Sequence, residues 1–308
     1  MSDTSEPRIL VTNDDGIDAP GIASLYEELS ALGEVTVVAP ATNQSGVGRT
    51  RNGRATVREH PWGYALAGTP ADCVAFGLGG GLADDDIEAP GVDVDGTATH
   101  PFDVVVSGVN DGPNAGNYVV GRSGTVGAGI EAAFLGVPAV AVSAYHTELF
   151  HPDAEQYDFN RPARVARRFV ERGLESGVFD EVDVLNLNAP VDAEPTGTRV
   201  TRPVADYGQR VSFEAADGGE SVSESEEDRG SASDEDERAV RLVDRSWPHI
   251  EGFENPFPGA EEHRHRYPED GDRVAMMDGA VSVSPLSVGH EHLDSATLAG
   301  LVEDVDLG

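Results

Sequence analysis

The chain has 308 residues, of which 39% are hydrophobic and 6% aromatic, which excludes a wholly disordered chain and allows a packed core. Its 56 acidic residues outnumber the 21 basic ones and give a formal net charge of −35. Such a surface repels nucleic-acid backbones and opposes its own compaction unless salt screens it, so we predict a halophilic protein with no nucleic-acid polymer as partner.

The first elements along the chain form a βαβ pattern. Residues 8–11 are predicted to be a short apolar strand and residues 34–39, rich in Val and Thr, a second one. Between them Pro20 opens an amphipathic helix that Gly33 ends. The apolar residues that recur at helical spacing are Ile22, Leu25, Tyr26, Leu29 and Leu32. This unit predicts a parallel sheet whose strand-following loops share one edge.

The pattern continues to about residue 195. Further buried strands are predicted at 102–107, 138–142 and 183–188, with helices at 123–135 and 163–169. Residues 77–100 lack periodicity and are expected to form a surface loop. We therefore predict a Rossmann-like α/β domain of three layers with a parallel sheet over residues 1–195.

The remaining residues, 196–308, are expected to form a C-terminal extension. Residues 214–237 are a Ser, Glu, Asp and Gly tract that lacks the apolar surface to fold alone, so we predict a mobile acidic loop. A strand at 280–286 and a helix at 292–302 should follow. An acidic loop of this kind in a mesophilic protein is the alternative explanation of the net charge.

Adjacent carboxylates follow the first predicted strand, at Asp14 and Asp15. In an open parallel sheet the ligand crevice lies beyond the carboxyl ends of the strands. Two carboxylates about 4 Å apart repel by about 4 kcal/mol at an effective dielectric of about 20, so within a cleft they favour a bound cation. Considered alone, the same residues are also ordinary turn chemistry.

Three more polar segments are expected at this edge. Residues 39–48 carry Asn43 and Ser45 among glycines, although alone this segment is typical of a flexible loop. Asn110 follows the 102–107 strand and would stand beside the acidic pair if that strand neighbours the first one. Residues 123–125 begin a predicted helix, where Ser123, Gly124 and Thr125 offer an anion site or, for Ser123, a simple N-cap.

The donor types favour a hard cation, Mg²⁺ or Mn²⁺, over a zinc site of Cys and His. No Walker A, nucleophile-elbow or complete dinucleotide-binding motif is found, which weakens ATPase, serine-hydrolase and dehydrogenase interpretations. Histidines occur in two H-x-H pairs without further ligands, so we expect solvated surface side chains there. The pairs are His263 with His265 and His290 with His292.

The single cysteine, Cys73, excludes an intrachain disulfide. The N-terminal MSDTSEPR lacks a basic start and an apolar core of signal-peptide length, and no apolar run approaches the length of a membrane span. We therefore predict a cytoplasmic protein without a membrane partner.

With these motifs assembled, the chain resembles the SurE family of survival-protein nucleotidases. The resemblance is carried by ILVTNDDGIDAPGI (9–22), VTVVAPATNQSGVG (35–48), AGTPADCV (67–74), VVVSGVNDGPNAG (104–116) and SGTVGAGIEAAFLGVPAVAVS (123–143). Weaker similarity runs through residues 185–191 and 270–286. Several motifs in the right order make a chance match implausible.

The resemblance implies a phosphatase that holds one divalent cation per subunit and removes phosphate from nucleoside 5′- and 3′-monophosphates. It implies metal ligands at Asp14, Asp15, Ser45 and Asn110, and phosphate contacts at Asn43, Ser123, Gly124 and Thr125. Asp14, Asp15, Asn110 and Ser123 are the expected catalytic set, with water attacking phosphorus in line. An aspartyl-phosphate intermediate is the alternative route.

The family resemblance also implies exchange of C-terminal segments between subunits, hence a homodimer or homotetramer. One departure is Asp111, where many relatives carry a basic residue, so attraction of phosphate there is expected to be weaker. A haloacid-dehalogenase-like phosphatase would need D-x-D after the first strand, whereas here the aspartates are adjacent. A nucleotide or metal sensor on the same fold, without turnover, is the other alternative.

Overall fold

The computed structural model describes residues 6–82, 101–149, 157–205, 207–213, 240–245 and 264–289. The predicted acidic loop at 214–237 and the predicted helix at 292–302 lie outside these residues, as does most of the predicted loop at 77–100.

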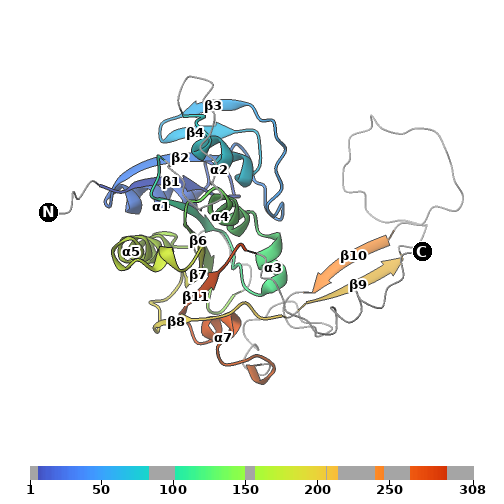
Figure 1. Cartoon of the computed structure of the whole chain (residues 1–308). Coiled ribbons are helices and arrows are strands. Elements are labelled where there is room, and N and C mark those ends of the chain that lie inside the picture. The colour runs from blue at the N-terminus through green and yellow to red at the C-terminus, as the bar shows by residue number, and fades with distance from the viewer. Residues whose placement is uncertain are drawn as a thin grey trace, which may run out of the picture.

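The central element is a nine-stranded sheet in the order β3-β4-β2-β1-β5-β6-β7-β11-β8 (Figure 1). Its strands are β1 (Arg8–Thr12), β2 (Glu34–Pro40), β3 (Val57–His60), β4 (Gly63–Leu66), β5 (Val104–Asn110), β6 (Ala139–Tyr145), β7 (Val184–Pro190), β8 (Thr198–Val200) and β11 (Val281–Leu286). The run from β4 to β7 is parallel throughout.

The predicted parallel sheet is therefore confirmed for its centre, and the structure adds antiparallel pairs at the flanks. β3 pairs antiparallel with β4, because the two residues between them permit only a hairpin. β11 pairs antiparallel with β7 and parallel with β8. The sheet is mixed, with parallel pairing dominant.

Helices cover both faces of this sheet and confirm the predicted three layers (Figure 1). On one face, α1 (Pro20–Ser30) and α5 (Asn160–Ser176) pack their apolar sides onto the sheet. On the other face, α2 (Pro70–Leu78) and α4 (Gly124–Phe134) do the same. The short elements are α3 (Asn117–Arg122), α7 (Asp272–Met277) and the 3₁₀ turns η2 (Val178–Asp180) and η3 (Arg264–Arg266). Every central strand and helix predicted up to residue 188 is confirmed.

Beyond residue 195 the chain both completes the sheet and leaves it. β8 and β11 join the main sheet, whereas β9 (Gly208–Phe213) and β10 (Val240–Arg245) form a separate antiparallel hairpin. Figure 1 shows this hairpin projecting from the body that contains the sheet. Because strands from both sides of residue 195 share one sheet, the division of the chain there stays a prediction.

No helix in the described parts of the chain combines the length and the apolar character that crossing a bilayer requires. Cys73 is a buried free thiol on α2. Burial, reinforced by the neighbouring Asp72, raises its thiol pKa, so this sulfur is a core side chain and not a reactive one.

Candidate active site

The predicted polar loops meet at β1, where the order of the strands reverses: β2 and β4 lie on one side of β1, and β5 and β6 lie on the other. β1 lies between β2 on one side and β5 on the other, with Thr12 opposite Ser107. The backbone amide of Gln44 donates to the carbonyl of Asp14 at 2.6 Å, which joins the loops after β1 and β2. The amide of Asp111 donates to Asp15 Oδ2 at 3.1 Å, which joins the loops after β1 and β5. This is the position at which open α/β sheets bind ligands.

A bulge at the end of β5 sets the position of Asn110. The register of β5 against β6 shifts between Ser107 and Asn110. Gly108 lies there at φ +134°, and a Cβ on it would stand 2.2 Å from the carbonyl oxygen of Val142, so only glycine fits. The Asn110 amide nitrogen donates to Gly112 at 2.6 Å, which leaves its side-chain carbonyl oxygen as the atom it offers a cation.

Asp14 is seated at the first turn of α4. Its side chain is buried with 3% exposure, and the Thr125 hydroxyl donates to Asp14 Oδ1 at 2.5 Å. Burial raises the carboxyl pKa, while hydrogen bonds from the Thr125 side chain and from the backbone of Thr125 and Gly124 favour its charged form. The positive end of the helix thus faces a carboxylate of the chain itself.

Asp15 is the less buried member of the pair. Burial, and next the charge of Asp14, raise the pKa of Asp15 from 3.8 to about 7. Neither carboxylate has an ion-pair partner among the Arg and His side chains of the described residues. Two close carboxylates without such a partner are an electrostatic cost that a divalent cation would remove.

The close approach of α4 to Asp14 predicts the effect of one methyl group. A Cβ on Gly124 would stand 2.7 Å from Asp14 Cβ and 2.8 Å from its Oδ2, so we expect Gly124→Ala to displace the carboxylate. Displacement of about 1 Å in a catalytic group costs about 100-fold in kcat/KM, which steady-state assays would measure. Gly197→Ala, where a Cβ meets nothing within 4 Å, is the matched control, and equal activity of the two variants would contradict this placement.

A polar cavity of about 300 Å³ opens at these loops. Its lining residues are Asp14, Ser45, Gly46, Asn110, Asp111, Asn114, Tyr118, Val119, Arg122 and Ser123. The structure thus brings together the predicted residues Asp14, Ser45, Asn110 and Ser123. Asp15 and Asn43 stand beside the cavity, where Asn43 Oδ1 accepts the amide of Ser45 at 2.8 Å.

The start of α4 differs from a free anion site. Ser123 caps the helix, since its Oγ accepts the amide of Val126 at 3.0 Å, as the N-cap interpretation predicted. Gly124 and Thr125 hold Asp14 through the hydrogen bonds described above, whereas their expected contact was phosphate. Sequence reasoning missed this because an anion supplied by a neighbouring strand satisfies the same donors as a bound one.

Two buried acidic residues that the motif analysis passed over brace the site loops. Glu131 on α4 accepts Arg49 Nη1 at 2.8 Å and Arg51 Nη1 at 3.2 Å, which ties the Ser45 loop to the helix that holds Asp14. Asp272 on α7 accepts the amide of Gly116 at 2.6 Å and so fixes the loop after β5. Glu131 lies four and three positions after the buried residues Gly127 and Ala128, and the two arginines balance its charge on that side of the helix.

A network of buried side chains on β6 and β7 holds the loop after β5 in place. The Asn114 amide nitrogen donates to Ser143 Oγ at 2.8 Å, and its backbone amide donates to Asn188 Oδ1 at 2.8 Å. The Asn114 carbonyl accepts from the side chains of Asn186 and Asn188 at 2.9 and 3.2 Å. These bonds fix Asn114 at the cavity wall. None of them uses the carboxylate of Asp14 or Asp15, so both carboxylates stay available to a cation.

The raised pKa of Asp15 predicts how cation affinity depends on pH. A carboxyl whose folded-state pKa is raised contributes stability below its ordinary pKa of 3.8 and loses that contribution as the pH rises through about 7. A cation must displace this proton, so we expect Mn²⁺ affinity to weaken about tenfold per pH unit below pH 7. Titration calorimetry in buffers of different ionisation enthalpy measures both affinity and proton release. An affinity that stays constant from pH 8 to pH 6 would contradict the expectation.

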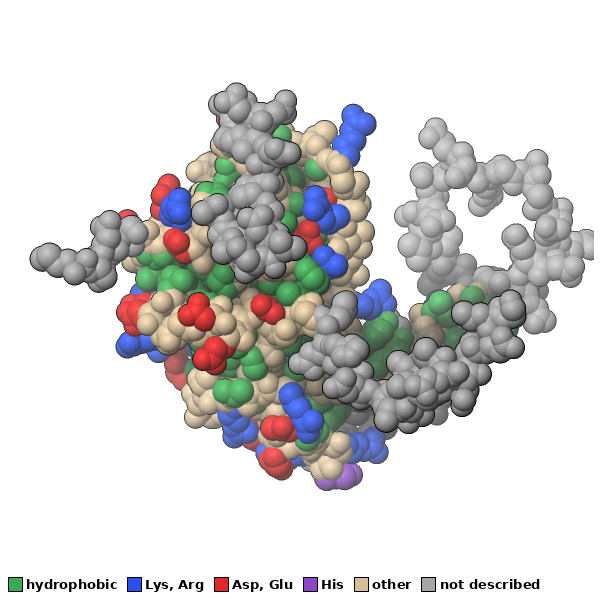
Figure 2. Space-filling view, in the orientation of Figure 1, with side chains coloured by type: hydrophobic (Ala, Val, Ile, Leu, Met, Phe, Trp, Pro, Cys, Tyr) green, Lys and Arg blue, Asp and Glu red, His purple; other side chains and the backbone are tan. Residues whose placement is uncertain are grey.

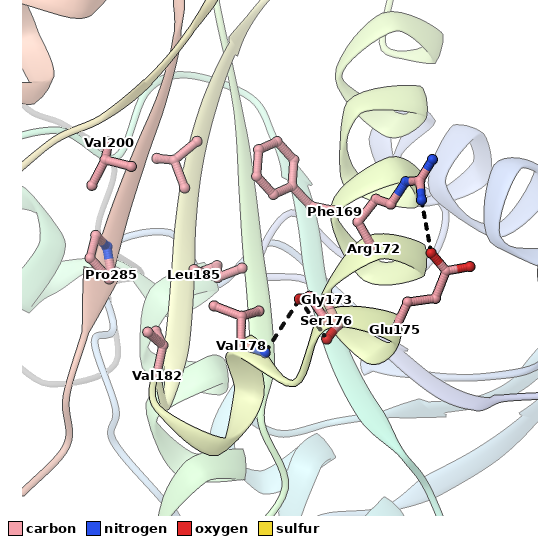
Figure 3. Close-up of a pocket in the computed structure, with 11 residues that line it drawn as sticks. Phe169, Arg172, Gly173, Glu175, Ser176, Val178, Val182, Leu185, Val200 and Pro285 are labelled. Carbon is pink, nitrogen blue, oxygen red and sulfur yellow. Dashed lines mark hydrogen bonds and ion pairs between the residues drawn. The ribbon is translucent and has the colours of Figure 1, made fainter.

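A larger groove of about 610 Å³ lies elsewhere, between the end of α5, η2 and the strands β7, β11 and β8 (Figure 3). Its lining is mainly apolar, and its charged residues, Arg172 and Glu175, pair with each other at 3.0 Å.

Of the predicted surface histidines, His265 is exposed on η3 and the other three lie outside the described residues. Within the described chain, no group of three or more His, Cys, Asp or Glu residues is placed to hold a metal.

Comparison with known proteins finds similarity to SurE proteins over nearly the whole chain. A family model described as survival protein SurE matches residues 9–210. The 5′-nucleotidase SurE of Halobacterium salinarum is 43% identical over 299 residues, which cover 95% of this chain and 96% of that protein. The 5′-nucleotidase SurE of Natronomonas pharaonis is 40% identical over 304 residues, which cover 96% and 98% of the two chains. The crystal structure of the SurE protein from Aquifex aeolicus matches with a TM-score of 0.67 at 28% identity and covers 97% of this chain and 100% of that one.

Proposed function

Because the chain belongs to the SurE family, we propose that it is a metal-dependent phosphomonoesterase that hydrolyses nucleoside 5′- and 3′-monophosphates. Its relatives named 5′-nucleotidase cover nearly all of the chain. The observation that carries the proposal is the buried carboxylate of Asp14 beside Asp15, at the mouth of a polar cavity that Ser45 and Asn110 also line.

The residues present fit a hard divalent cation. Asp14, Asp15, Ser45 and Asn110 all offer oxygen, the donor that Mg²⁺ and Mn²⁺ prefer. Loops joined by hydrogen bonds hold these residues, and the carboxylates lack Arg or His partners among the described residues. We propose that this set holds one Mg²⁺ or Mn²⁺ per subunit.

A divalent cation at this position supplies charge neutralisation for the phosphoryl group and acidifies water. Ser123 lines the cavity, and its hydroxyl hydrogen is free to be donated to a phosphoryl oxygen, because its Oγ acts as acceptor toward Val126. Asn114 is held by its hydrogen bonds to Asn188 and Ser143, and it lines the cavity together with Asn110. These residues orient the phosphoryl group for an in-line displacement.

We favour water over Asp14 as the nucleophile. The Asp14 carboxylate accepts the Thr125 hydroxyl and the amides at the start of α4, so these donors fix its orientation, and we assign its remaining lone pairs to the cation and not to attack on phosphorus. In the direct reaction a water oxygen bonds to phosphorus, the ester P–O bond breaks, and the nucleoside oxygen takes up a proton. Acid quenching during turnover of AMP that carries ³²P in its phosphate tests this, since ³²P retained on a peptide that contains Asp14 would show a covalent route.

The experiment that tests the proposed function is phosphate release from AMP, 3′-AMP and p-nitrophenyl phosphate at high KCl with Mn²⁺ or Mg²⁺. We expect turnover of both nucleotides, abolished by EDTA. A folded, cation-loaded protein that binds AMP and releases no phosphate would overturn the proposal and support a sensor on the same fold.

We propose that the chain forms a homodimer or homotetramer in the cytoplasm through its C-terminal region, residues 196–308. The hairpin of β9 and β10 projects from the body that contains the sheet, and Figure 2 shows hydrophobic side chains along the hairpin. The exposed ones are Val211, Phe213, Val240 and Leu242. Such a surface favours a partner, because apolar area gains from leaving water. Gel filtration with light scattering at 2 M KCl should give a multimer, and a monomer would contradict the proposal.

A further inference from the structure

The short helix α3 forms part of the wall of the polar cavity that Asp14 lines. Three of its lining residues, Tyr118, Val119 and Arg122, belong to that helix. They share a cavity of about 300 Å³ with Asp14, Ser45 and Ser123 of the proposed phosphate site. That volume is at the lower end of the range for pockets that enclose a whole small molecule, so it exceeds the need of a phosphoryl group alone.

The side chains on α3 are arranged as one unit. Arg122 Nη1 donates to Tyr118 Oη at 2.9 Å, and the Arg122 Cζ lies 5.7 Å from the Tyr118 ring centroid. The Tyr118 ring in turn stacks on Tyr207, with centroids 3.5 Å apart and planes 16° apart. Tyr207 belongs to the segment that leads into β9, which Figure 1 shows beside α3. These contacts fix the ring and the guanidinium at the cavity wall.

This chemistry differs from that of the rest of the cavity. Asp14, Ser45, Asn110 and Ser123 offer oxygen atoms suited to a cation and a phosphoryl group. An aromatic ring with an attached guanidinium suits a flat, electron-rich heterocycle, since nucleobases stack on Tyr and on Arg planes. Among the described residues that line the cavity, Arg122 also brings a positive charge to a wall that carries Asp14 and Asp111.

We propose that Tyr118 and Arg122 bind the nucleoside portion of the substrate and so select nucleotides over small aliphatic phosphate esters. This assignment rests on the proposed function, because it takes the phosphoryl group to lie at Asp14. It gives α3 the role of a specificity element, next to the residues that hold the reacting group.

The stacking of Tyr118 on Tyr207 has a second explanation. In it, Tyr118 only packs the segment that leads into β9 against α3. A purely structural role would lower the turnover of every substrate by a similar factor. A role in nucleoside recognition changes the ratio between substrates that share the phosphoryl group and differ in the leaving group. The ratio of kcat/KM for AMP to that for glycerol 2-phosphate separates the two explanations.

The test compares wild-type protein with Tyr118→Leu, Tyr118→Phe and Arg122→Gln at high KCl with Mn²⁺. We expect Tyr118→Leu to lower the AMP to glycerol 2-phosphate ratio about tenfold, mainly through the KM for AMP. Tyr118→Phe keeps the stacking ring and should restore most of the ratio, while Arg122→Gln should give an intermediate loss. The matched control is Tyr26→Leu, because Tyr26 is half of another stacked pair, with Trp62 at 4.9 Å, packed against the core.

A ratio unchanged in both Tyr118→Leu and Arg122→Gln would overturn the proposal, as would a Tyr118→Phe variant as impaired as Tyr118→Leu. If wild-type protein hydrolyses neither ester, the proposed function fails separately. In that case calorimetric titrations with AMP and with inorganic phosphate decide the inference. Tyr118→Leu must then weaken AMP binding about tenfold more than phosphate binding, and equal weakening would overturn it.

Discussion

Replacement of Asp14 by Asn is expected to lower kcat/KM for AMP by about 100- to 1000-fold, with the fold intact. Asn keeps the size of the side chain but removes the negative charge that we propose the cation requires, and it places an NH₂ group against donors at the start of α4. Loss of one electrostatic group of this kind costs about 10²–10³ in rate even where the rest of a site is intact. Phosphate release at saturating Mn²⁺, with calorimetric Mn²⁺ binding, measures the effect.

The matched control for Asp14→Asn is Asp18→Asn, four positions along the same loop. The Asp18 carboxylate is 78% exposed and its contact with His60 Nε2 is long, at 3.8 Å, so this contact is of small energetic value. We expect Asp18→Asn to retain wild-type turnover and Mn²⁺ affinity. An Asp14→Asn variant that keeps turnover within tenfold of the wild type would remove Asp14 from the proposed ligand set.

Removal of salt is expected to destabilise the whole protein. The 56 acidic residues against 21 basic ones repel each other over distances that the Debye length controls, about 10 Å at 0.1 M and about 3 Å at 1 M ionic strength. We expect the Tm to rise by on the order of 10 °C between 0.1 and 2 M KCl, since about 1 kcal/mol shifts the Tm of a chain this large by about 2–4 °C. The relatives from Halobacterium salinarum and Natronomonas pharaonis come from halophilic archaea, which agrees with this expectation.

Thermal melts followed by circular dichroism across a KCl series, repeated with NaCl, test this expectation. Screening depends on ionic strength, so both salts should raise the Tm by similar amounts. A Tm that is constant or falls with KCl would favour the alternative of a mesophilic protein whose net charge comes from an acidic loop.

The centre of the fold could be predicted because its signals are local. The apolar strand before Asp14, the helix opened by Pro20 and the Val-rich strand before Asn110 each show their periodicity within a few residues. The predicted strand at 280–286 is confirmed as β11, but its place in the sheet could not be predicted in the same way. β7 ends at Pro190 and β11 begins at Val281, so the antiparallel direction of β11 depends on the path of a long connection.

The same distinction holds for the candidate site. Motif spacing predicted that the loops carrying Asp14, Ser45 and Asn110 would meet, and the structure brings these side chains to one cavity. It could not predict that Thr125 donates to Asp14, because that contact joins residues 111 positions apart. Nor did any local signal indicate that Asp272 fixes the loop at Gly116 from 156 positions away. Long-range contacts that position a site leave no periodic trace in the sequence.

The measurement that tests the central claim most directly is an add-back titration on the wild-type protein. The protein is treated with EDTA, dialysed at 2 M KCl, and assayed for phosphate release from AMP as Mn²⁺ is added from zero to several equivalents. We predict no turnover at zero and a rise that saturates near one equivalent per subunit. Undiminished turnover in the EDTA-treated, cation-free protein, or a folded protein inactive at every Mn²⁺ concentration, would contradict a metal-dependent phosphomonoesterase.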